Sequence, residues 1–434
     1  MSRDLSINVH HITRVEGHGN IVVDVKNGVL KRAYLNIVEP PRFFEAMLKG
    51  RNFHEAAIIT SRICGICSLG HQMTSLKATE AALGLEVSEQ TVILRKILVH
   101  GATFQSNVLH ALFLAAPDFL NVGSVFPLVH THKDVVQAAL RLKHLANEIG
   151  ALISGRAVHP ISIVPGGFTK LPSEKDLTYL RDKLANEGMK DAMFAIDILA
   201  TLADQIPEFY RETEYISLYN DKEYAFYDGL ICSSDAGLFP VEEYESVTNE
   251  FIVAHSTSKH TKFNRSSYMV GALARFNNSY ELLRPKAKEV AAKLGLQAPN
   301  YNPYMNTVAQ MVEVVHCIED SIELLDVLLQ RGIKNEKPNQ EPTRYGRGIA
   351  ATEVPRGILF HDYTYNRKGQ IEHANCIIPT GQNLANIDDD MRKLVPEIIH
   401  ESKQEITKKL EMLVRAYDPC ISCSVHMLDV QFEE

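Results

Sequence analysis

Apolar and polar residues alternate along residues 5–38, which is the pattern of strands with one buried face. The alternation runs through SINVHHIT and then through GNIVVDVKNGVLKRAYLNIVE. Asn27-Gly28, in the second segment, is a pair that favours a tight hairpin turn. We therefore predict an N-terminal β region at 5–38.

From about residue 43 the apolar residues recur every three or four positions, as they do on the buried face of a helix. This spacing predicts a helical core over 43–333, in which Ser88 is the N-cap of a long buried helix. The section 207–280 interrupts the core, because it mixes short strand-like runs with loops. The expected helices are 43–50, 54–84, 88–119, 132–155, 173–206, 281–295 and 303–332.

Proline and glycine at 337–347 and 355–357 predict loops, and a second small β unit is expected around them, with its turn at Lys368-Gly369. We expect a β/loop region at 340–385, and then the C-terminal helix and metal motif at 387–434. The predicted fold class is α+β, predominantly α: a long-helix bundle core with small peripheral β-sheets at the N-terminal region and around 350–380. Residues 1–434 are expected to form a single domain.

The composition is that of a globular protein, since 45% of the 434 residues are hydrophobic and 23% are charged. The net charge of -8 argues against a nucleic-acid-binding protein. The first residues carry no apolar signal-peptide core, and no uninterrupted apolar stretch has the length of a transmembrane helix. We expect a cytoplasmic protein without direct membrane insertion.

Four of the seven cysteines form two CxxC pairs at opposite ends of the chain. Cys64, Cys67 and His71 have the spacing that places three side chains on one face of a helix. In the second pair, DPCISC, we expect a short helix with Asp418 as its N-cap and Pro419 in its first turn. A CxxC at a helix start favours thiolate, the form that binds metal.

A single CxxC would be ambiguous, because it is compatible with a redox motif, half a zinc site or two core thiols. Two pairs so far apart suit a buried centre that joins both ends of the chain better than a local zinc ribbon. Four thiolates select iron, nickel or zinc, and the residues alone leave that choice open. The isolated Cys232, Cys317 and Cys376 are expected to be structural.

Five motifs occur in order along the chain: RVEGHG, RICGIC with a following GH, TEVPRG, IIPTGQN and DPCISCSVH. Together they resemble the large, catalytic subunit of nickel–iron hydrogenases, over essentially the whole chain. The resemblance is closest to the cytoplasmic, bidirectional, multi-subunit branch that includes sulfhydrogenases. It implies an oxidoreductase that cleaves H2 reversibly and heterolytically into protons and electrons, at a nickel–iron centre with one carbon monoxide and two cyanides on iron.

The resemblance also implies the ligand roles. Cys64 and Cys420 match terminal nickel ligands, and Cys67 and Cys423 match the thiolates that bridge nickel and iron. A terminal thiolate such as that of Cys420 is a candidate first proton acceptor.

Glu16, in RVEGH, matches a carboxylate that relays protons from a terminal nickel thiolate. Arg356, in TEVPRG, matches a guanidinium that lies over the metal pair, hydrogen-bonds one cyanide and polarises hydrogen. Thr380 matches the hydroxyl that donates to the other cyanide. Without the resemblance, Glu16 would be read as solvent-facing and Arg356 as a surface-loop residue.

His71 matches a histidine that orients a bridging cysteine, His110 keeps a matching histidine position, and Asp418 is expected to contact Arg356. Ser106 stands where membrane-bound relatives tend to carry an aspartate, which puts that part of the arginine–aspartate network in doubt.

Glu45 and His426 match ligands of a second, magnesium site, with the Cys376 backbone carbonyl as a third ligand; another divalent ion is the alternative. Eight residues follow His426, at the place where the family removes a C-terminal peptide after nickel insertion.

All four paired cysteines are committed to one site, so electrons must leave through a partner. We expect an iron–sulfur small subunit, followed by flavin and iron–sulfur diaphorase-type subunits that reach NAD(P) or another soluble carrier. No GxGxxG nucleotide fingerprint is present in this chain. The alternatives are a non-catalytic scaffold subunit like that of respiratory complex I, or a four-cysteine iron–sulfur or zinc protein.

Overall fold

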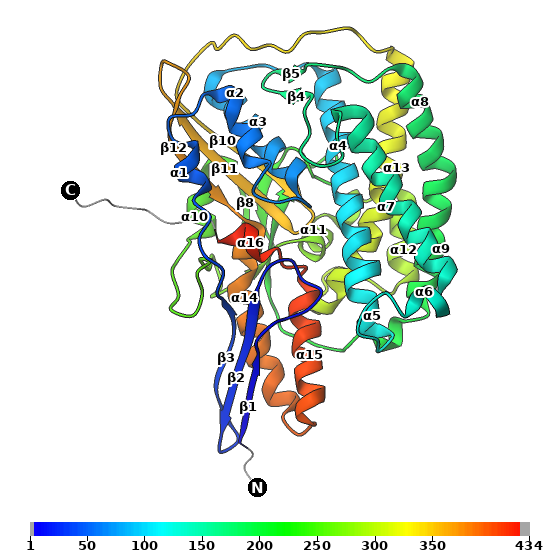
Figure 1. The fold of residues 1–434 in the computed structure, drawn as a ribbon, viewed down its shortest axis with the longest axis vertical. Coiled ribbons are helices and arrows are strands. Elements are labelled where there is room, and N and C mark those ends of the chain that lie inside the picture. The colour runs from blue at the N-terminus through cyan, green and yellow to red at the C-terminus, as the bar shows by residue number, and fades with distance from the viewer. Residues whose placement is uncertain (1–3, 426–434) are drawn as a thin grey trace, which may run out of the picture.

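The N-terminal sheet is the first feature of the computed structural model, which describes residues 4–425 (Figure 1). It is antiparallel in the order β1-β2-β3, with the bounds Leu5–Val9, Gly19–Lys26 and Val29–Ile37. Buried positions alternate along β2, and Asn27 and Gly28 have φ angles of 52° and 72°, as in a tight hairpin of the predicted kind. The first strand is shorter than predicted, because residues 10–18 leave the sheet to contact the C-terminal segment.

The helical bundle lies beside this sheet and is built around one continuous helical stretch that begins after Ser88. The Ser88 hydroxyl accepts from Thr91 N–H, as expected of an N-cap. This stretch packs between α7 and α13. The bundle elements are α4 Glu89–Val108, π-helical η1 Leu109–Ala115, α5 Ala116–Phe119, α6 Leu128–Thr131, α7 Lys133–Ser154, α8 Glu174–Lys183, π-helical η2 Leu184–Gly188, α9 Met189–Ala200, α12 Pro285–Lys293 and α13 Asn306–Arg331.

Within residues 4–425, the stretch Glu89–Phe119 is the one helix whose length and apolarity would suffice to cross a membrane. Two thirds of its most apolar window, 67%, is buried against the rest of the protein, as in the core helix of a bundle.

A second sheet, β10-β11-β12, stands against three helices, and the RICGIC segment lies between the last two of them (Figure 1). The strands are Arg347–Val354, Gly357–Tyr365 and Ile371–Ile377, and the helices are α1 Phe44–Leu48, α2 Phe53–Thr60 and α3 Ser68–Leu83. Helix α3 crosses β10 and β11. The close approach is possible because Gly348 presents no side chain to the α3 backbone at Ala78 and Ala82.

The middle of the chain forms the short strands and loops that were predicted there. A sheet of order β8-β7-β6-β9 is antiparallel except for the parallel pair β6–β9. The elements are β4 Ile163–Val164, β5 Gly167–Phe168, η3 Ala203–Gln205, β6 Glu214–Tyr219, β7 Leu230–Ser233, β8 Gly237–Phe239, η4 Val241–Glu243, α10 Tyr244–Thr248, β9 Tyr268–Met269, α11 Ala272–Ser279, η5 Tyr280–Leu282 and η6 Pro303–Met305.

The C-terminal part returns to helix earlier than predicted. Helix α14 spans Pro379–Ile398, α15 spans Lys403–Ala416 and the short α16 spans Ile421–Ser424. The expected start at 387 is wrong, because Pro379 occupies the first turn, where a missing N–H is tolerated. The IIPTGQN motif therefore lies at a helix start and not in a loop. The C-terminal helix that was expected within 387–434 is two long helices, α14 and α15, before the short α16.

The fold is α+β and predominantly α, as predicted. One hydrophobic cluster contains residues of β1–β3 together with residues of α4, α13 and α15, so the N-terminal strands share a core with the bundle. Two smaller clusters lie around β10–β12 and β6–β7. On this basis we propose that the chain forms one domain.

We predict that Gly348→Ala lowers the free energy of unfolding by about 1–3 kcal/mol, the usual cost of overpacking. The added methyl group would meet backbone atoms of α3, which cannot rotate away. Gly346→Ala is the matched control, because the Gly346 Cβ position has nothing within 4 Å. Urea unfolding of both variants checks this; equal losses would contradict the close packing of α3 on β10.

Candidate metal centre

The two CxxC pairs meet in the interior, where the loop before α3 faces α16 (Figure 1). All four cysteines are buried and free. The Sγ atoms of Cys64 and Cys420 are 3.5 Å apart, and those of Cys67 and Cys423 are 3.9 Å apart. Within the second pair, Cys420 Sγ and Cys423 Sγ are 2.6 Å apart. Segments from opposite ends of the chain thus contribute two thiols each to one cluster.

Two predictions about the local backbone are wrong. Cys64, Cys67 and His71 do not share a helix face, because α3 begins only at Ser68 and the segment before it is irregular. Asp418 is not an N-cap: its φ is 51°, α16 begins at Ile421, and Cys420 is at the cap position. Cys67 and Cys420 each directly precede a helix.

The cluster has the dimensions of a site for a soft metal. Metal–sulfur bonds of about 2.3 Å let two sulfurs on one ion lie up to roughly 4.6 Å apart. The four Sγ atoms all lie within 4.8 Å of one another. Hydrogen bonding from Cys420 lowers the pKa of Cys64, whereas hydrogen bonding with Cys423 raises the pKa of Cys420 and burial raises that of Cys423. The protein alone therefore does not stabilise four thiolates, and a cation would.

Arg356 is buried in the turn between β10 and β11, beside this cluster. Its Nε donates to the Asp418 carbonyl (2.6 Å) and its Nη2 to Asp418 Oδ1 (2.8 Å). Burial would lower the pKa of Arg356, but Asp418 and the cysteines, Cys420 first, raise it well above its usual value. The predicted contact between Arg356 and Asp418 is present.

Ser106 takes part in the same network, since Arg356 Nη1 donates to its hydroxyl at 3.5 Å. The carboxylate partner of the arginine is thus Asp418 and not a residue of α4. Gln310 Nε2 donates to Asp418 Oδ2 (3.1 Å), and the Gln310 side chain contacts His110 Nδ1 (2.5 Å). Gln310 and Asp418 therefore connect His110 to Arg356.

Thr380 lies in the first turn of α14, and its hydroxyl oxygen accepts from Cys420 N–H at 2.9 Å. The oxygen is used as an acceptor, so the hydroxyl proton is available for donation. The structure thus brings Thr380 directly to the cysteine motif.

Glu16 is half-buried and lies against the turn that carries Cys420 and Cys423. Its carbonyl accepts from Ile421 N–H (2.9 Å), and its carboxylate accepts from Ser422 N–H (3.2 Å) and from the Ser422 hydroxyl. Neighbouring Arg14 anchors the segment by donating to Asp118 (2.5 Å). The carboxylate is therefore fixed between the cysteine turn and the outside of the protein.

His71 lies in the first turn of α3, with its backbone N–H bonded to the Cys67 carbonyl (3.2 Å). Its Nδ1 is 3.4 Å from His361 Nε2, and His361 Nδ1 is 2.6 Å from the hydroxyl of Tyr363, which donates to Ser75 (3.1 Å). Sequence reasoning missed His361 and Tyr363. Their i, i+2 spacing on one strand face was the available signal.

The expected second metal site is only partly within the described residues. Burial raises the pKa of Cys376, and the charge of Glu45 adds to this, so the Glu45 carboxylate lies near Cys376. His426 lies outside the described residues. Val425, the last of them, accepts from Arg42 N–H at 2.7 Å, so the chain leaves the described part beside the segment that leads to Glu45.

Arg275, on α11, was also missed, and it holds the turn that carries Arg356. The side chain is fully buried, and all five of its N–H groups are used. They donate to Glu313 (2.6 and 2.8 Å) and to Glu353 (2.7 Å). The remaining two donate to the carbonyls of Val354 and Pro355, both at 3.0 Å. Because these carbonyls directly precede Arg356, Arg275 is a positioning residue for it.

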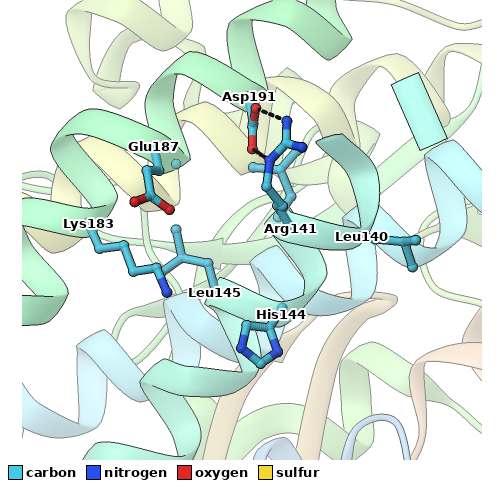
Figure 2. A pocket seen from close by; sticks show the side chains of 9 residues that line it. Leu140, Arg141, His144, Leu145, Lys183, Glu187 and Asp191 are labelled. Atoms are coloured by element: carbon cyan, nitrogen blue, oxygen red, sulfur yellow. Dashed lines mark hydrogen bonds and ion pairs between the residues drawn. The ribbon is translucent and has the colours of Figure 1, made fainter. Parts of the chain in front are cut away.

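An open surface pocket between α7 and the η2–α9 segment does not carry comparable chemistry (Figure 2). Its cations are already paired: Arg141 donates twice to Asp191, both at 2.7 Å, and Lys183 donates to Glu148 at 2.7 Å. It lies on the bundle side away from α16 (Figure 1). This pocket therefore offers no free charged group comparable with the buried cysteine cluster.

Comparison with known proteins gives a consistent result. The family model described as nickel-dependent hydrogenase matches residues 42–137 and 208–426, and a model described as HoxL-like matches residues 6–39. Sulfhydrogenase 1 subunit alpha of Pyrococcus furiosus is 35% identical over 98% of each chain. The NAD-reducing hydrogenase HoxS subunit beta of Cupriavidus necator is 27% identical, over 99% of this chain and 96% of its own.

A solved structure, that of an NAD+-reducing nickel–iron hydrogenase in the H2-reduced state, superimposes with a TM-score of 0.88 at 25% identity. It covers 98% of this chain and 100% of its own.

We predict that Arg275→Lys lowers the free energy of unfolding by about 3 kcal/mol or more, because lysine keeps the charge but has three donors and leaves buried acceptors unpaired. Arg141→Lys is the matched control, since Arg141 makes the same two-pronged contact with a carboxylate on a side chain that is 55% exposed. Its cost should stay within about 1 kcal/mol. Urea unfolding measures both. Similar losses in the two variants would mean that the buried hydrogen bonds of the Arg275 guanidinium do not stabilise the fold more than an exposed ion pair does.

Proposed function

The chain belongs to the nickel-dependent hydrogenase family as its large-subunit type, and we propose that its four buried cysteines hold the nickel–iron centre. The protein is accordingly an oxidoreductase that cleaves H2 reversibly into protons and electrons. One observation carries the assignment: four thiols from two ends of the chain converge on one buried point of the right size for a soft metal. A scaffold subunit without catalysis would have no use for this cluster.

In the proposed centre, Cys64 and Cys420 would bind nickel as terminal ligands, and Cys67 and Cys423 would be the thiolates shared by nickel and iron. Each N-terminal cysteine faces its C-terminal counterpart in the same role, Cys64 opposite Cys420 and Cys67 opposite Cys423, which supports this division. When bound, the metal pair, with one carbon monoxide and two cyanides on iron, supplies a low-spin, electron-rich site for heterolytic H2 cleavage.

Arg356 and Thr380 are the proposed donors to the two cyanides. Among the described residues, Asp418 and Ser106 take three of the five N–H groups of Arg356, so others can donate to a ligand. The Thr380 hydroxyl accepts from Cys420 N–H and keeps its proton for donation. A permanently charged guanidinium held by Asp418 also strengthens the field in which H2 is polarised.

Glu16 is the proposed first relay for protons that leave the Cys420 thiolate. The backbones of Glu16 and Cys420 run side by side as a bridge, and the carboxylate is bonded to Ser422, two residues after Cys420. A carboxylate beside a metal–thiolate site can accept a proton and pass it outward. His71, Asp418 and His110 act on the geometry of the site and not on the proton itself.

A magnesium ion at Glu45, the Cys376 carbonyl and His426 is proposed as a second site. The proximity of Glu45 to Cys376, and the exit of the chain at Val425 beside Arg42, support it. Such an ion would tie the C-terminal segment to α1 and so stabilise the cysteine turn.

An iron–sulfur small subunit is the proposed electron acceptor, with diaphorase-type subunits after it, as the NAD-reducing relative suggests. Next to the Cys64 loop, exposed Ile58 and Ile161 line one surface hollow together with Arg62 and His159, and such a surface suits a protein partner. All seven cysteines are free thiols, which fits the proposed location in the reducing cytoplasm.

Cys423→Ser tests the centre itself. Loss of a shared thiolate should abolish assembly, so that nickel falls from near one per chain to background and the infrared bands of iron-bound carbon monoxide and cyanide disappear. Cys232→Ser is the control, because Cys232 lies outside the cluster. Elemental analysis and infrared spectroscopy are the measurements. Normal nickel in Cys423→Ser would exclude the shared role, and zinc alone in the wild type would overturn the assignment.

Glu16→Gln should leave nickel and iron content unchanged but slow exchange of H2-derived protons with solvent by about 100-fold, because the amide cannot carry a proton. Glu39→Gln is the matched control: its carboxylate is also close by, but it accepts from His18 N–H at 2.6 Å and not from the cysteine turn. H2/D2O exchange followed by mass spectrometry measures the effect. Unchanged exchange in Glu16→Gln would place the proton exit elsewhere.

A further inference from the structure

A second group of metal-binding side chains lies away from the cysteine cluster. His255 and His260 flank a loop in the middle of the chain, and both face Asp388 of α14. Thr380, which contacts Cys420, lies at the start of the same helix, and the rise per residue places Asp388 about 12 Å further along. The proposed nickel–iron and magnesium sites use none of these three residues.

The three ligand atoms have the spacing of ligands on one ion. His255 Nε2 is 3.0 Å and His260 Nε2 is 3.4 Å from the same oxygen, Asp388 Oδ2. In a tetrahedral site with metal–ligand bonds of about 2.0–2.1 Å, neighbouring ligand atoms lie roughly 3.3–3.4 Å apart. All three atoms lie within 4.8 Å of one another. Two imidazoles and one carboxylate are thus already gathered at near-coordination distances.

The protein holds these side chains in place without an ion. Asp388 Oδ1 accepts from Leu35 N–H at 2.8 Å, which orients the carboxylate and leaves Oδ2 toward the rings. The Tyr34 ring stacks on His255 with a centroid distance of 4.3 Å. The two imidazole rings are nearly perpendicular, at 89°. Supports of this kind orient ligands around a metal and fix their geometry.

Two of the three side chains are buried, and the third is partly exposed. The side chains of His260 and Asp388 are each 3% exposed, and His260 Nδ1 has no hydrogen-bond partner among residues 4–425. His255 is 22% exposed at its side chain, which leaves a path for an ion and a water ligand.

The charge of Asp388 also supports a bound cation. The only cation besides the histidines that pairs with Asp388 in the described part of the chain is Arg392, whose Nη2 is 3.7 Å from Oδ2. The Arg392 side chain is half exposed and is held more closely by Asp389, at 2.7 Å. A histidine binds metal as the neutral ring, so the Asp388 carboxylate would give the occupied cluster one negative charge, which suits a divalent ion.

We propose that His255, His260 and Asp388 bind one divalent first-row cation, zinc by preference, with water completing a tetrahedral site. The ion is a structural clamp. It joins β3, through Leu35, to the 255–260 loop and to α14. The same loop reaches the nickel–iron motif, because the Ser258 hydroxyl donates to the Ser424 carbonyl at 2.9 Å. The ion would therefore help to hold the cysteine turn in place through the Ser258–Ser424 hydrogen bond.

The test uses the full-length, metal-loaded enzyme, dialysed against a chelator and then titrated with Zn2+ alone. After the titration, the wild type should bind one zinc per chain. Zinc X-ray absorption should then show nitrogen and oxygen ligands at about 2.0–2.1 Å and no sulfur ligand at about 2.3 Å. Zinc should also raise the apparent melting temperature. In His255→Gln the affinity should fall by at least about 100-fold, and the thermal shift should vanish.

Two further variants keep the result interpretable. His144→Gln is the matched control, because His144 also pairs with a carboxylate, that of Glu148, but its side chain is 73% exposed. It should bind zinc like the wild type. Asp388→Asn keeps an acceptor for Leu35 N–H but loses the charge, and should bind as weakly as His255→Gln. Zinc binding that is absent in the wild type, unchanged in His255→Gln, or accompanied by sulfur ligands would overturn the proposal.

Discussion

Four thiols that share one buried volume can all be ionised only around a cation, and this constraint organises the molecule. The cysteines come from opposite ends of the chain, so folding must bring the loop before α3 against α16 before a centre can form. Burial supplies the low dielectric in which each added charge is costly, and the same burial makes a metal–thiolate bond strong once a metal is present. A site of this kind is therefore a property of the whole fold.

The residues around the cluster hold the C-terminal cysteine turn and the Arg356 turn in place through hydrogen bonds. Glu16 is bonded to the backbone and hydroxyl of the C-terminal turn, and Thr380 accepts from Cys420 N–H. Arg356 is held by Asp418, and Arg275 holds the backbone that precedes Arg356. Most of these contacts use backbone groups or fully paired charges, so each side chain is confined to one orientation. Such preorganisation lets a few polar groups act on a small, uncharged substrate like H2.

The proposed routes for protons and for electrons begin at different parts of the structure. The proposed proton route begins at Glu16, beside the C-terminal cysteine turn, whereas the proposed partner surface is the exposed apolar hollow near the Cys64 loop. The proposed zinc and magnesium sites lie outside the cysteine cluster and would fasten the segments that carry it. Metal content would in this way influence both the chemistry and the stability of the C-terminal turn.

Local sequence signals determined much of this picture. Alternation predicted β1–β3, three- and four-residue spacing predicted α4, α7 and α13, and Asn27-Gly28 predicted the hairpin. The ordered motifs indicated the family and the four cysteines of the cluster. These signals are local, because strand and helix periods repeat over a few residues and because CxxC spacing is read within one segment.

The tertiary structure decided the rest. It placed Cys64 and Cys67 in a loop and gave Asp418 a left-handed backbone, against the local expectation. It also revealed partners that no motif announces: Arg275 behind the Arg356 turn, Gln310 between His110 and Asp418, and Asp388 between two histidines. These contacts join residues far apart in the chain, and no local periodicity encodes which distant side chain will satisfy a buried charge.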